Sequence, residues 1–451
     1  MTTEEQAATD LERLQLLLQG DEHDLRAAIE LLDVHPADQS DLYEALGSED
    51  RQKMLALLSA EGVAALLEHL DEELLRELVD DMPRATLARV LDQTDNDVAA
   101  DILRMLPPAE AARTLSQMNT APEVTPLLRH EDESAGGLMT RGYITLHPDM
   151  TASEAVAFLR ATRPLASEAY YLYVLDARNH LQGVVNLRQL IIADPETHLQ
   201  DIMETDVISV TEDTDQEEVA NLMQHYRVRS LPVVDADGVL RGVITGDDII
   251  DVIQEEATED MYIMAGLPGQ DSLYASVGVS ARRRIPWLIV NLVTAFFAGA
   301  IVALFEGTIA DAAALAVFMP VIAGQGGNAG IQTVTIVVRG IALGELEPGD
   351  GWRVLRKELA LGVIRGVFFG VLVGAVALLW QGEWAWGAVV GGAMMANMII
   401  AGLLGTLIPV TLRQLKLDPA LGSGVFLTAF TDMLGFLFLL GLGTIALSEL
   451  R

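Results

Sequence analysis

The most constraining feature of this sequence is a series of five apolar stretches toward its C-terminus. They cover residues 285–305, 312–338, 359–380, 384–411 and 419–447, and their only charged side chains are Arg365 and Asp432. A helix that rises about 1.5 Å per residue needs about 20 apolar residues to cross a hydrocarbon core about 30 Å thick. The stretches therefore predict five membrane-spanning helices. The polar start MTTEEQAATD has none of the features of a signal peptide.

The rest of the chain is strongly acidic. Of the 29 basic and 65 acidic residues in the chain, 11 and 10 lie from Arg282 onward, which leaves 18 and 55 upstream. All eight histidines also lie upstream and there is no cysteine, so the apolar half has no imidazole or thiolate ligand for a metal. An acidic surface repels nucleic acid. The composition predicts a soluble acidic module joined to a membrane module, with no nucleic-acid partner.

Basic residues cluster in alternate loops of the membrane module. They lie at 282–284, at 339–357 and at 413–416, whereas the connections EGTIAD and QGE carry acids and no base. Short loops rich in lysine and arginine stay on the cytoplasmic side. We therefore expect a multi-pass protein of a bacterial or archaeal-type plasma (inner) membrane, in contact with lipid. Its N-terminal module is expected in the cytoplasm and its C-terminus outside.

Asp432 is a carboxylate inside the last apolar stretch. It lies 13 residues from the start of that stretch, which is about 20 Å along a helix and near the membrane midplane. A charge at that depth costs at least about 2.5 to 3.5 kcal/mol on insertion scales, so it normally faces water or a partner. We expect an ion pathway here. The alternatives are a hydrogen bond from a protonated Asp432 to another helix, or an ion pair with Arg365.

The second apolar stretch contains the sequence PVIAGQGGNAGIQ, which includes Pro320, Gly327 and Asn328. Proline and glycines are expected to break the helix, and broken backbone at membrane depth survives where it lines a wet cavity. Freed carbonyls near Gly327 and the Asn328 amide would then be oxygen ligands. The alternative is a face of small residues for close helix packing.

Oxygen ligands alone favour a hard cation, Mg²⁺ or Ca²⁺. One carboxylate per chain is too few for a dehydrated Ca²⁺ cage, whereas Mg²⁺ is often held by one or two carboxylates and retained waters. Two chains paired about a twofold axis would bring two Asp432 side chains to one hydrated ion. We therefore expect a homodimer that conducts Mg²⁺.

The soluble module divides into two kinds of pattern. Residues 1–132 have leucines at three- and four-residue spacing with acids between them, which predicts an all-α, superhelical N-terminal domain. Residues 133–254 contain a repeat of strands and helices, in which GVVNLRQLI matches GVITGDDII at a shift of 59 and Met139 matches Met203 at a shift of 64. This α/β repeat resembles a tandem CBS-type regulatory pair. An acidic connecting helix is expected at 255–281, followed by the five-helix transmembrane domain at 282–451.

The whole chain resembles the MgtE family of magnesium channels. The resemblance rests on PVIAGQGGNAG, ESAGGLMT, TDQEEVANLM, EEATED and LDPAL in this order, together with the mid-membrane aspartate. It implies a homodimeric Mg²⁺ channel, not an enzyme, that is closed by cytosolic Mg²⁺. Asp432 would be the pore carboxylate, and Thr428 would lie in the turn that supplies backbone oxygens.

The resemblance also implies regulatory metal sites in the acidic module. Asp97 and Asp101 would face Asp248 and Asp251 across the N-domain and the second repeat. The remaining candidates, in the connecting helix, the last cytoplasmic loop and the start of the two repeats, are Glu256, Glu259, Asp260, Asp418, Gly136 and Asp215. Two unit charges about 4 Å apart repel by about 4 kcal/mol at an effective dielectric of 20, so facing acids require cations to stay close. Mg²⁺ would compact the module and close the gate, and its loss would release the gate.

Tyr170 and Arg188 lie near the cleft in which some family members bind ATP. Arg227 and Val228 stand where an acidic and an aromatic residue are expected, which argues against ATP as a ligand here. The alternative functions are a coupled carrier of Mg²⁺, Co²⁺ or Ni²⁺, and a nucleotide-sensing regulator anchored by its spans. Salt adaptation is a competing explanation of the excess of acids.

Overall fold

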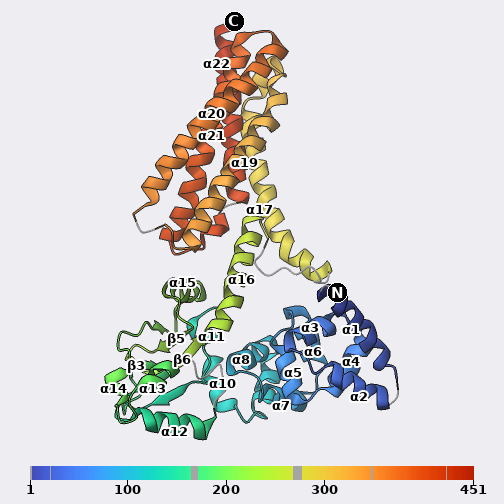
Figure 1. Cartoon of the computed structure of the whole chain (residues 1–451). Coiled ribbons are helices and arrows are strands. Elements are labelled where there is room, and N and C mark those ends of the chain that lie inside the picture. Colours follow the sequence, from blue (N-terminus) through green and yellow to red (C-terminus); the bar gives the residue numbers. More distant parts are fainter. Residues whose placement is uncertain are drawn as a thin grey trace. The chain divides into compact units, whose positions relative to one another are not determined.

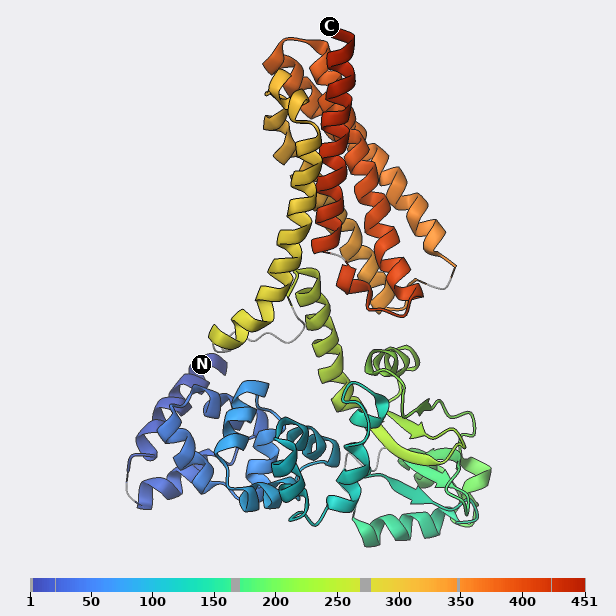
Figure 2. The ribbon, with the colours of Figure 1, turned by 180° about the vertical axis from the view of Figure 1, so that it is seen from behind.

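The computed structural model describes residues 3–20, 22–163, 171–267, 277–346, 349–422 and 424–450. The chain separates into two compact units, Met1–Ile253 and Gln254–Arg451. Figures 1 and 2 trace the chain through both units from opposite sides.

The first unit begins with a series of short helices, as the leucine spacing predicts. Side chains cap several of them: Ser59 accepts from the Gly62 N–H and Asp71 accepts from the Leu74 N–H, which satisfies amides that a helix start leaves unpaired. The helices are α1 (Thr3–Leu17), α2 (Glu22–Leu31), α3 (Pro36–Ala45), α4 (Ser48–Leu57), α5 (Ala60–Leu67), α6 (Glu72–Asp81), α7 (Arg84–Leu91), α8 (Asn96–Met105), α9 (Pro108–Leu115) and α10 (Ala121–Leu127).

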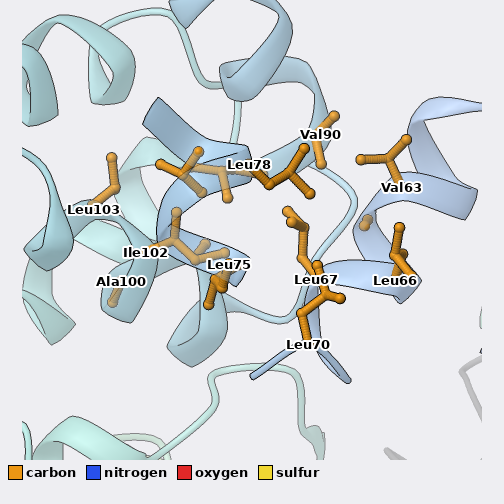
Figure 3. Packing of buried hydrophobic residues seen from close by; sticks show 14 of the residues in the cluster. Val63, Leu66, Leu67, Leu70, Leu75, Leu78, Val90, Ala100, Ile102 and Leu103 are labelled. Atoms are coloured by element: carbon orange, nitrogen blue, oxygen red, sulfur yellow. The ribbon is translucent and has the colours of Figure 1, made fainter. Parts of the chain in front are cut away.

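Leucines at helical spacing form the core of these helices. In Figure 3, Leu67 of α5 lies near Leu78 of α6 and Val90 of α7, and Ile102 of α8 extends the same buried cluster on the side away from Leu66. The same hydrophobic cluster continues through the second half of the repeat as far as residue 252, whereas the first half has a separate core. The N-terminal helices are therefore packed on the second half of the repeat, which brings α8 toward the helix that begins at Gly246.

The repeat folds into two three-stranded sheets of the same topology. In each sheet the first strand runs parallel to the second and the second antiparallel to the third. The elements are α11 (Ala135–Leu138), β1 (Ile144–Leu146), α12 (Ala152–Thr162), β2 (Tyr171–Leu175), β3 (Leu181–Asn186), α13 (Leu187–Ile192), α14 (Leu199–Ile202), β4 (Val210–Thr211), α15 (Gln216–Tyr226), β5 (Ser230–Val234), β6 (Leu240–Thr245) and α16 (Gly246–Met264).

Backbone pairs between the two halves repeat at the predicted shifts. Thr140 exchanges hydrogen bonds with Val243, and Glu204 exchanges them with Val184. Thr140 and Glu204 are 64 residues apart, and Val184 and Val243 are 59 apart, the two shifts found in the sequence. The internal repeat is thus confirmed as two copies of one fold that pair with each other.

The second unit consists of the end of α16 and long helices that run alongside one another in both views (Figures 1 and 2). They are α17 (Val277–Leu304), α18 (Glu306–Asp311), α19 (Leu315–Ala342), α20 (Gly351–Gln381), α21 (Trp384–Gln414), a 3-10 turn (Pro419–Gly422) and α22 (Val425–Leu450). The connecting helix expected at 255–281 is instead the end of α16, which ends at Met264. Residues 268–276 of that range lie outside the described residues.

Four stretches in the described chain are long and apolar enough to cross a membrane: Val277–Leu304, Gly351–Gln381, Trp384–Gln414 and Pro419–Glu449. These confirm four of the five predicted spans. Helix α19 has 28 residues, which is sufficient length, but its glycines, glutamines and asparagine lower its mean hydropathy. A fifth span remains a prediction.

The expected break in the second apolar stretch is wrong, because α19 is one continuous helix from Leu315 to Ala342. Pro320 lies near its start, where a missing N–H interrupts little of the ladder. The glycines are explained by close packing. A Cβ on Gly326 would lie 2.1 Å from Asn397 Nδ2, and one on Gly330 would lie 2.7 Å from Leu427 Cδ2. The small-residue face, the alternative interpretation, is therefore the one that fits the structure.

Candidate functional site

The candidate pore residues lie on two neighbouring helices, α19 and α22. A Cβ on Gly327 of α19 would lie 3.8 Å from Thr428 Cγ2 and 4.0 Å from Thr431 Oγ1 of α22. Thr428 donates its hydroxyl to the Gly424 carbonyl at 2.8 Å, which turns its oxygen back toward its own helix. Helix packing thus brings Gly327 to Thr428, one turn before Asp432.

Asp432 is half-buried and Asn328 is exposed on the surface of the single chain. Among the described residues, no hydrogen bond or ion pair to the Asp432 carboxylate is present. Arg365, the basic partner considered from the sequence, instead lies 3.3 Å from Glu358 on its own helix α20. The alternative of an Asp432–Arg365 pair is therefore not seen.

Glu358 is a functional candidate that the sequence analysis missed. Its side chain is 2% exposed and accepts a hydrogen bond from Thr333 Oγ1 of α19 at 3.0 Å. The third apolar stretch begins at the following residue, Leu359, so Glu358 fell outside the predicted span. The spacing of seven residues to Arg365 could have revealed it, since residues i and i+7 share a helix face.

A group of acids lies where α8 meets the start of α16 in the first unit. Asp97 is 8% exposed, and its Oδ1 has no hydrogen-bond partner among the described residues. Burial raises the pKa of the Asp97 carboxyl, and the nearby charges of Asp248 and Asp95 raise it further. Burial likewise raises the pKa of Asp248, although Thr245 donates to its carboxylate through both its N–H and its hydroxyl. The structure thus brings Asp97 and Asp248 together, as expected.

The other two residues expected in this acidic group, Asp101 and Asp251, do not join it as predicted. Asp101 shares the Arg104 guanidinium with Asp132, each at 2.5 Å from Nη1, so it already has a cationic partner. Asp251 is exposed on α16. Glu68 was not predicted, yet burial and the charges of Asp95 and Asp248 raise its pKa. Glu68 lies 29 residues before Asp97, and no local spacing could have placed it here.

A second acidic pair lies in the C-terminal unit. Burial and the neighbouring Asp418 raise the pKa of Asp260, near the end of α16, to about 6. Burial raises the pKa of Asp418 too, while an N–H···O bond of 2.7 Å from Ala420 opposes that rise. Glu256 and Glu259 lie half-buried on the same helix. The expected proximity of Asp260 to Asp418 is present.

Gly136 and Asp215 have structural roles in the first unit. The Gly136 N–H donates to the Glu212 carbonyl at 2.8 Å, and a Cβ there would lie 2.6 Å from the ring of His130. Asp215 caps α15 by accepting from the Glu217 N–H at 2.9 Å. Within the described ranges, no three Asp, Glu or His side chains are arranged to hold a metal ion directly.

The described part of the structure does not bring together Tyr170 and Arg188, the two residues expected to bind a nucleotide. Tyr170 lies outside the described residues, and Arg188 is exposed on α13. Gln189, its neighbour, is occupied in capping the same helix through Asn186 and in a 3.2 Å bond to Glu204 Oε1.

Three parts of the chain match known protein families. Residues 319–442 match the MgtE divalent cation transporter, residues 34–133 match the MgtE intracellular N domain, and residues 135–196 and 199–255 match CBS domains. The magnesium transporter MgtE of Thermus thermophilus is 36% identical over 464 residues, covering 98% of this chain and 99% of that protein. The magnesium transporter MgtE of Bacillus subtilis is 34% identical and covers 95% of each chain.

Solved structures resemble the soluble part. The soluble part of a magnesium transporter aligns with a TM-score of 0.51 and 35% identity, over 56% of this chain and 99% of that one. The cytosolic domain of the Mg²⁺ channel MgtE in complex with ATP aligns with a TM-score of 0.51 and 41% identity, over 54% and 99%. The helical domain, the CBS pair and the apolar helices together define a divalent-cation transport protein of the membrane. The chain belongs to the MgtE family of magnesium transporters.

Proposed function

We propose that this protein is a homodimeric Mg²⁺ channel whose pore carboxylate is Asp432. The observation that carries the proposal is the separation of charges in the C-terminal unit: Arg365 is paired with Glu358, and Asp432 has no such partner among the described residues. An unpaired carboxylate within an apolar helix is costly and normally marks an ion path. Thr428 lies one turn before Asp432 on α22, and Gly327 of α19 packs against Thr428, so both lie beside the same path.

The path runs between two subunits. Asn328 is exposed and Asp432 half-buried on the single chain, as expected of residues that face a partner across a water-filled route. Two subunits supply two Asp432 carboxylates, which suits an Mg²⁺ ion that keeps most of its water.

Cytosolic Mg²⁺ closes the channel by binding between acids. In the first unit the charge of Asp248 raises the pKa of the buried Asp97, and in the second the charge of Asp418 raises the pKa of the half-buried Asp260. When ionised they repel, so a divalent cation stabilises the arrangement in which they are close. Loss of cytosolic Mg²⁺ lets the acids separate and opens the gate, which gives negative feedback on uptake. The N-terminal module lies in the cytoplasm and the C-terminus outside the plasma membrane.

A coupled carrier is the competing transport mechanism, and ATP is the second candidate ligand. ATP is favoured by the solved complex of a 41% identical cytosolic domain and opposed by Arg227 and Val228 in this chain. Calorimetric titration of ATP decides the ligand. A Mg²⁺ flux that rises linearly with the electrochemical gradient of Mg²⁺, and that does not depend on Na⁺ or pH gradients, identifies a channel rather than a carrier.

The proposal is tested by complementation of a cell that requires added Mg²⁺. We expect wild-type protein to restore growth at low Mg²⁺ and Asp432→Ala to fail at equal membrane abundance. The control is Asp350→Asn, which removes an acid just before α20. Growth with Asp432→Ala equal to that of wild type would overturn the pore assignment.

A further inference from the structure

We propose that Glu358 and Asn397 are positioning residues that hold helix α19 in register beside the pore carboxylate, and thereby set the discrimination between Mg²⁺ and other divalent cations. The inference rests on the proposed function, in which Mg²⁺ passes Asp432. Neither residue is placed in the ion path itself. Each fixes α19 through a hydrogen bond on one side of Gly327 and Asn328.

The first fixed point is made by Asn397 on α21. Its side chain is 0% exposed, and Nδ2 donates to the Ile322 carbonyl of α19 at 2.9 Å. Space for the amide exists because Gly326 and Gly435 have no side chains. A Cβ on Gly326 would lie 2.1 Å from Nδ2, and a Cβ on Gly435 would lie 2.9 Å from it. A buried amide costs about 1 to 3 kcal/mol where its polar atoms lack partners, and Asn397 Oδ1 has none among the described residues. Leucine would fill this space without that cost, so an asparagine here indicates a directional contact.

The second fixed point is made by Glu358 on α20. Its buried carboxylate accepts from Thr333 Oγ1 of α19 at 3.0 Å, and Arg365 Nη2 lies 3.3 Å from the same oxygen. The Arg365 guanidinium supplies a counter-charge to this carboxylate, and a hydrogen bond accepted by a carboxylate is stronger than one between neutral groups. Helix α19 is thus tied to α20 as well as to α21.

Helices α20 and α21 form a close-packed base for both contacts. A Cβ on Gly370 would lie 2.7 Å from the Gly391 carbonyl oxygen, and one on Gly374 would lie 2.7 Å from that of Gly387. Contacts this close leave no room for one helix to slide past the other without a clash. Glu358 and Asn397 therefore belong to one rigid hairpin.

The two contacts bracket the pore-lining part of α19. Ile322 lies five residues before Gly327 and Thr333 lies six after it, so the fixed points are about 16 Å apart along the helix. A rotation or slide of α19 that moved Gly327 relative to Thr428 would break one or both bonds. Because a hydrated ion is recognised through the spacing of oxygens, loss of either bond widens the range of ions that fit.

The test measures Mg²⁺ and Ca²⁺ influx into liposomes that contain the purified full-length protein. Thr333→Val removes the hydroxyl with little change of shape, Thr333→Ser keeps it, and Asn397→Leu removes the amide. Thr406→Val is the matched control, since Thr406 is equally buried on α21 but donates only to its own helix, at Gly402.

We expect Thr333→Val and Asn397→Leu to lower the Mg²⁺/Ca²⁺ flux ratio about tenfold, which corresponds to about 1.4 kcal/mol of differential binding. Thr333→Ser and Thr406→Val should keep the wild-type ratio. A wild-type ratio in folded, dimeric Thr333→Val overturns the inference, even if Asn397→Leu fails to fold. Asp432→Ala, measured in parallel, separates the pore assignment from the positioning role. Full Mg²⁺ flux through Asp432→Ala rejects the pore assignment. Loss of that flux, together with an unchanged Mg²⁺/Ca²⁺ ratio in the Thr333 variants, rejects only the positioning role.

Discussion

The Arg365 guanidinium lies 3.3 Å from the Glu358 carboxylate, seven residues earlier on the same helix. This pair neutralises the basic group that could have bound Asp432, and Asp432 has no cationic partner among the described residues. In this account, conduction past Asp432 depends on how α19 and α22 are held together. Closure of the path depends on the Mg²⁺ that compacts the acidic module.

Removal of one member of the Arg365–Glu358 pair should harm the protein more than removal of both. Arg365→Gln leaves the buried carboxylate with only the exposed Lys357 ammonium as a counter-charge, 3.7 Å from Glu358 Oε1. Removing one partner of a fully buried pair costs up to about 3 to 5 kcal/mol. Arg365 is a quarter exposed, so we expect a smaller loss. Thermal unfolding in detergent is the measurement. Glu358→Gln combined with Arg365→Gln should unfold at a higher temperature than Arg365→Gln alone, and a further fall would contradict the pairing.

Neutralising Asp97 should stabilise the acidic module when Mg²⁺ is absent. Asp97→Asn removes a buried charge that Asp248 and Asp95 repel, and in a domain of this size each kcal/mol gained raises Tm by about 2 to 4 °C. The same variant should need more Mg²⁺ for inhibition of flux. Glu30→Gln, at an exposed acid of α2, is the control. If the Tm measured with chelator is no higher for Asp97→Asn than for wild type, the acids do not oppose compaction.

The Asp260 carboxyl predicts a pH dependence of the closed state. Burial and Asp418 raise its pKa from 3.8 to about 6, so the compact state binds more protons than the open one between about pH 4 and pH 6. Without Mg²⁺, the compact state is then favoured at low pH and loses stability as pH rises through this window. Mg²⁺ influx into liposomes whose interior contains no Mg²⁺ at the start should therefore fall as the pH on the cytoplasmic side of the protein drops from 7.5 to 5.5.

Asp260→Asn should flatten that part of the pH profile, because it removes the titrating carboxyl. It should also weaken the inhibition by Mg²⁺ at pH 7.5, where wild-type Asp260 is ionised. An identical pH profile in wild type and Asp260→Asn would show that another group controls the response.

A methyl group on Gly370 should destabilise the C-terminal unit. Its Cβ would lie 2.7 Å from the Gly391 carbonyl oxygen, so α20 and α21 must separate. Gly441→Ala is the matched control, because a Cβ there meets no atom within 4 Å. We expect a loss of about 1 to 3 kcal/mol for Gly370→Ala, as for overpacked cores, and almost none for Gly441→Ala. Equal unfolding temperatures in detergent would contradict this close approach.

The elements with a strong local pattern could be predicted from the sequence. The repeat shifts of 59 and 64 correspond to the backbone pairs Val184 with Glu204 and Thr140 with Val243, since equal sequence patterns fold into equal sheets. The apolar lengths predicted four of the long helices. The continuity of α19 could not be predicted, because glycines that break an isolated helix are tolerated where Asn397 and Leu427 pack against them.

The candidate site was predicted less completely than the fold. Asp432 was found because one charge in an apolar stretch stands out, and Asp97 and Asp248 followed from the family resemblance. Glu358 was hidden at the edge of a stretch, and Asn397 was one polar residue in an uncharged run. Their roles depend on contacts with Thr333 and Ile322, which are distant in sequence.

The most direct test of the account is Mg²⁺ flux into liposomes that contain wild type, Asp432→Asn or Asp311→Asn, at equal protein density. Asp432→Asn keeps the size of the side chain and removes its charge, and Asp311→Asn removes an acid at the end of α18. The account predicts that Asp432→Asn loses almost all Mg²⁺ flux while Asp311→Asn retains it. Wild-type Mg²⁺ flux through folded, dimeric Asp432→Asn would contradict the account.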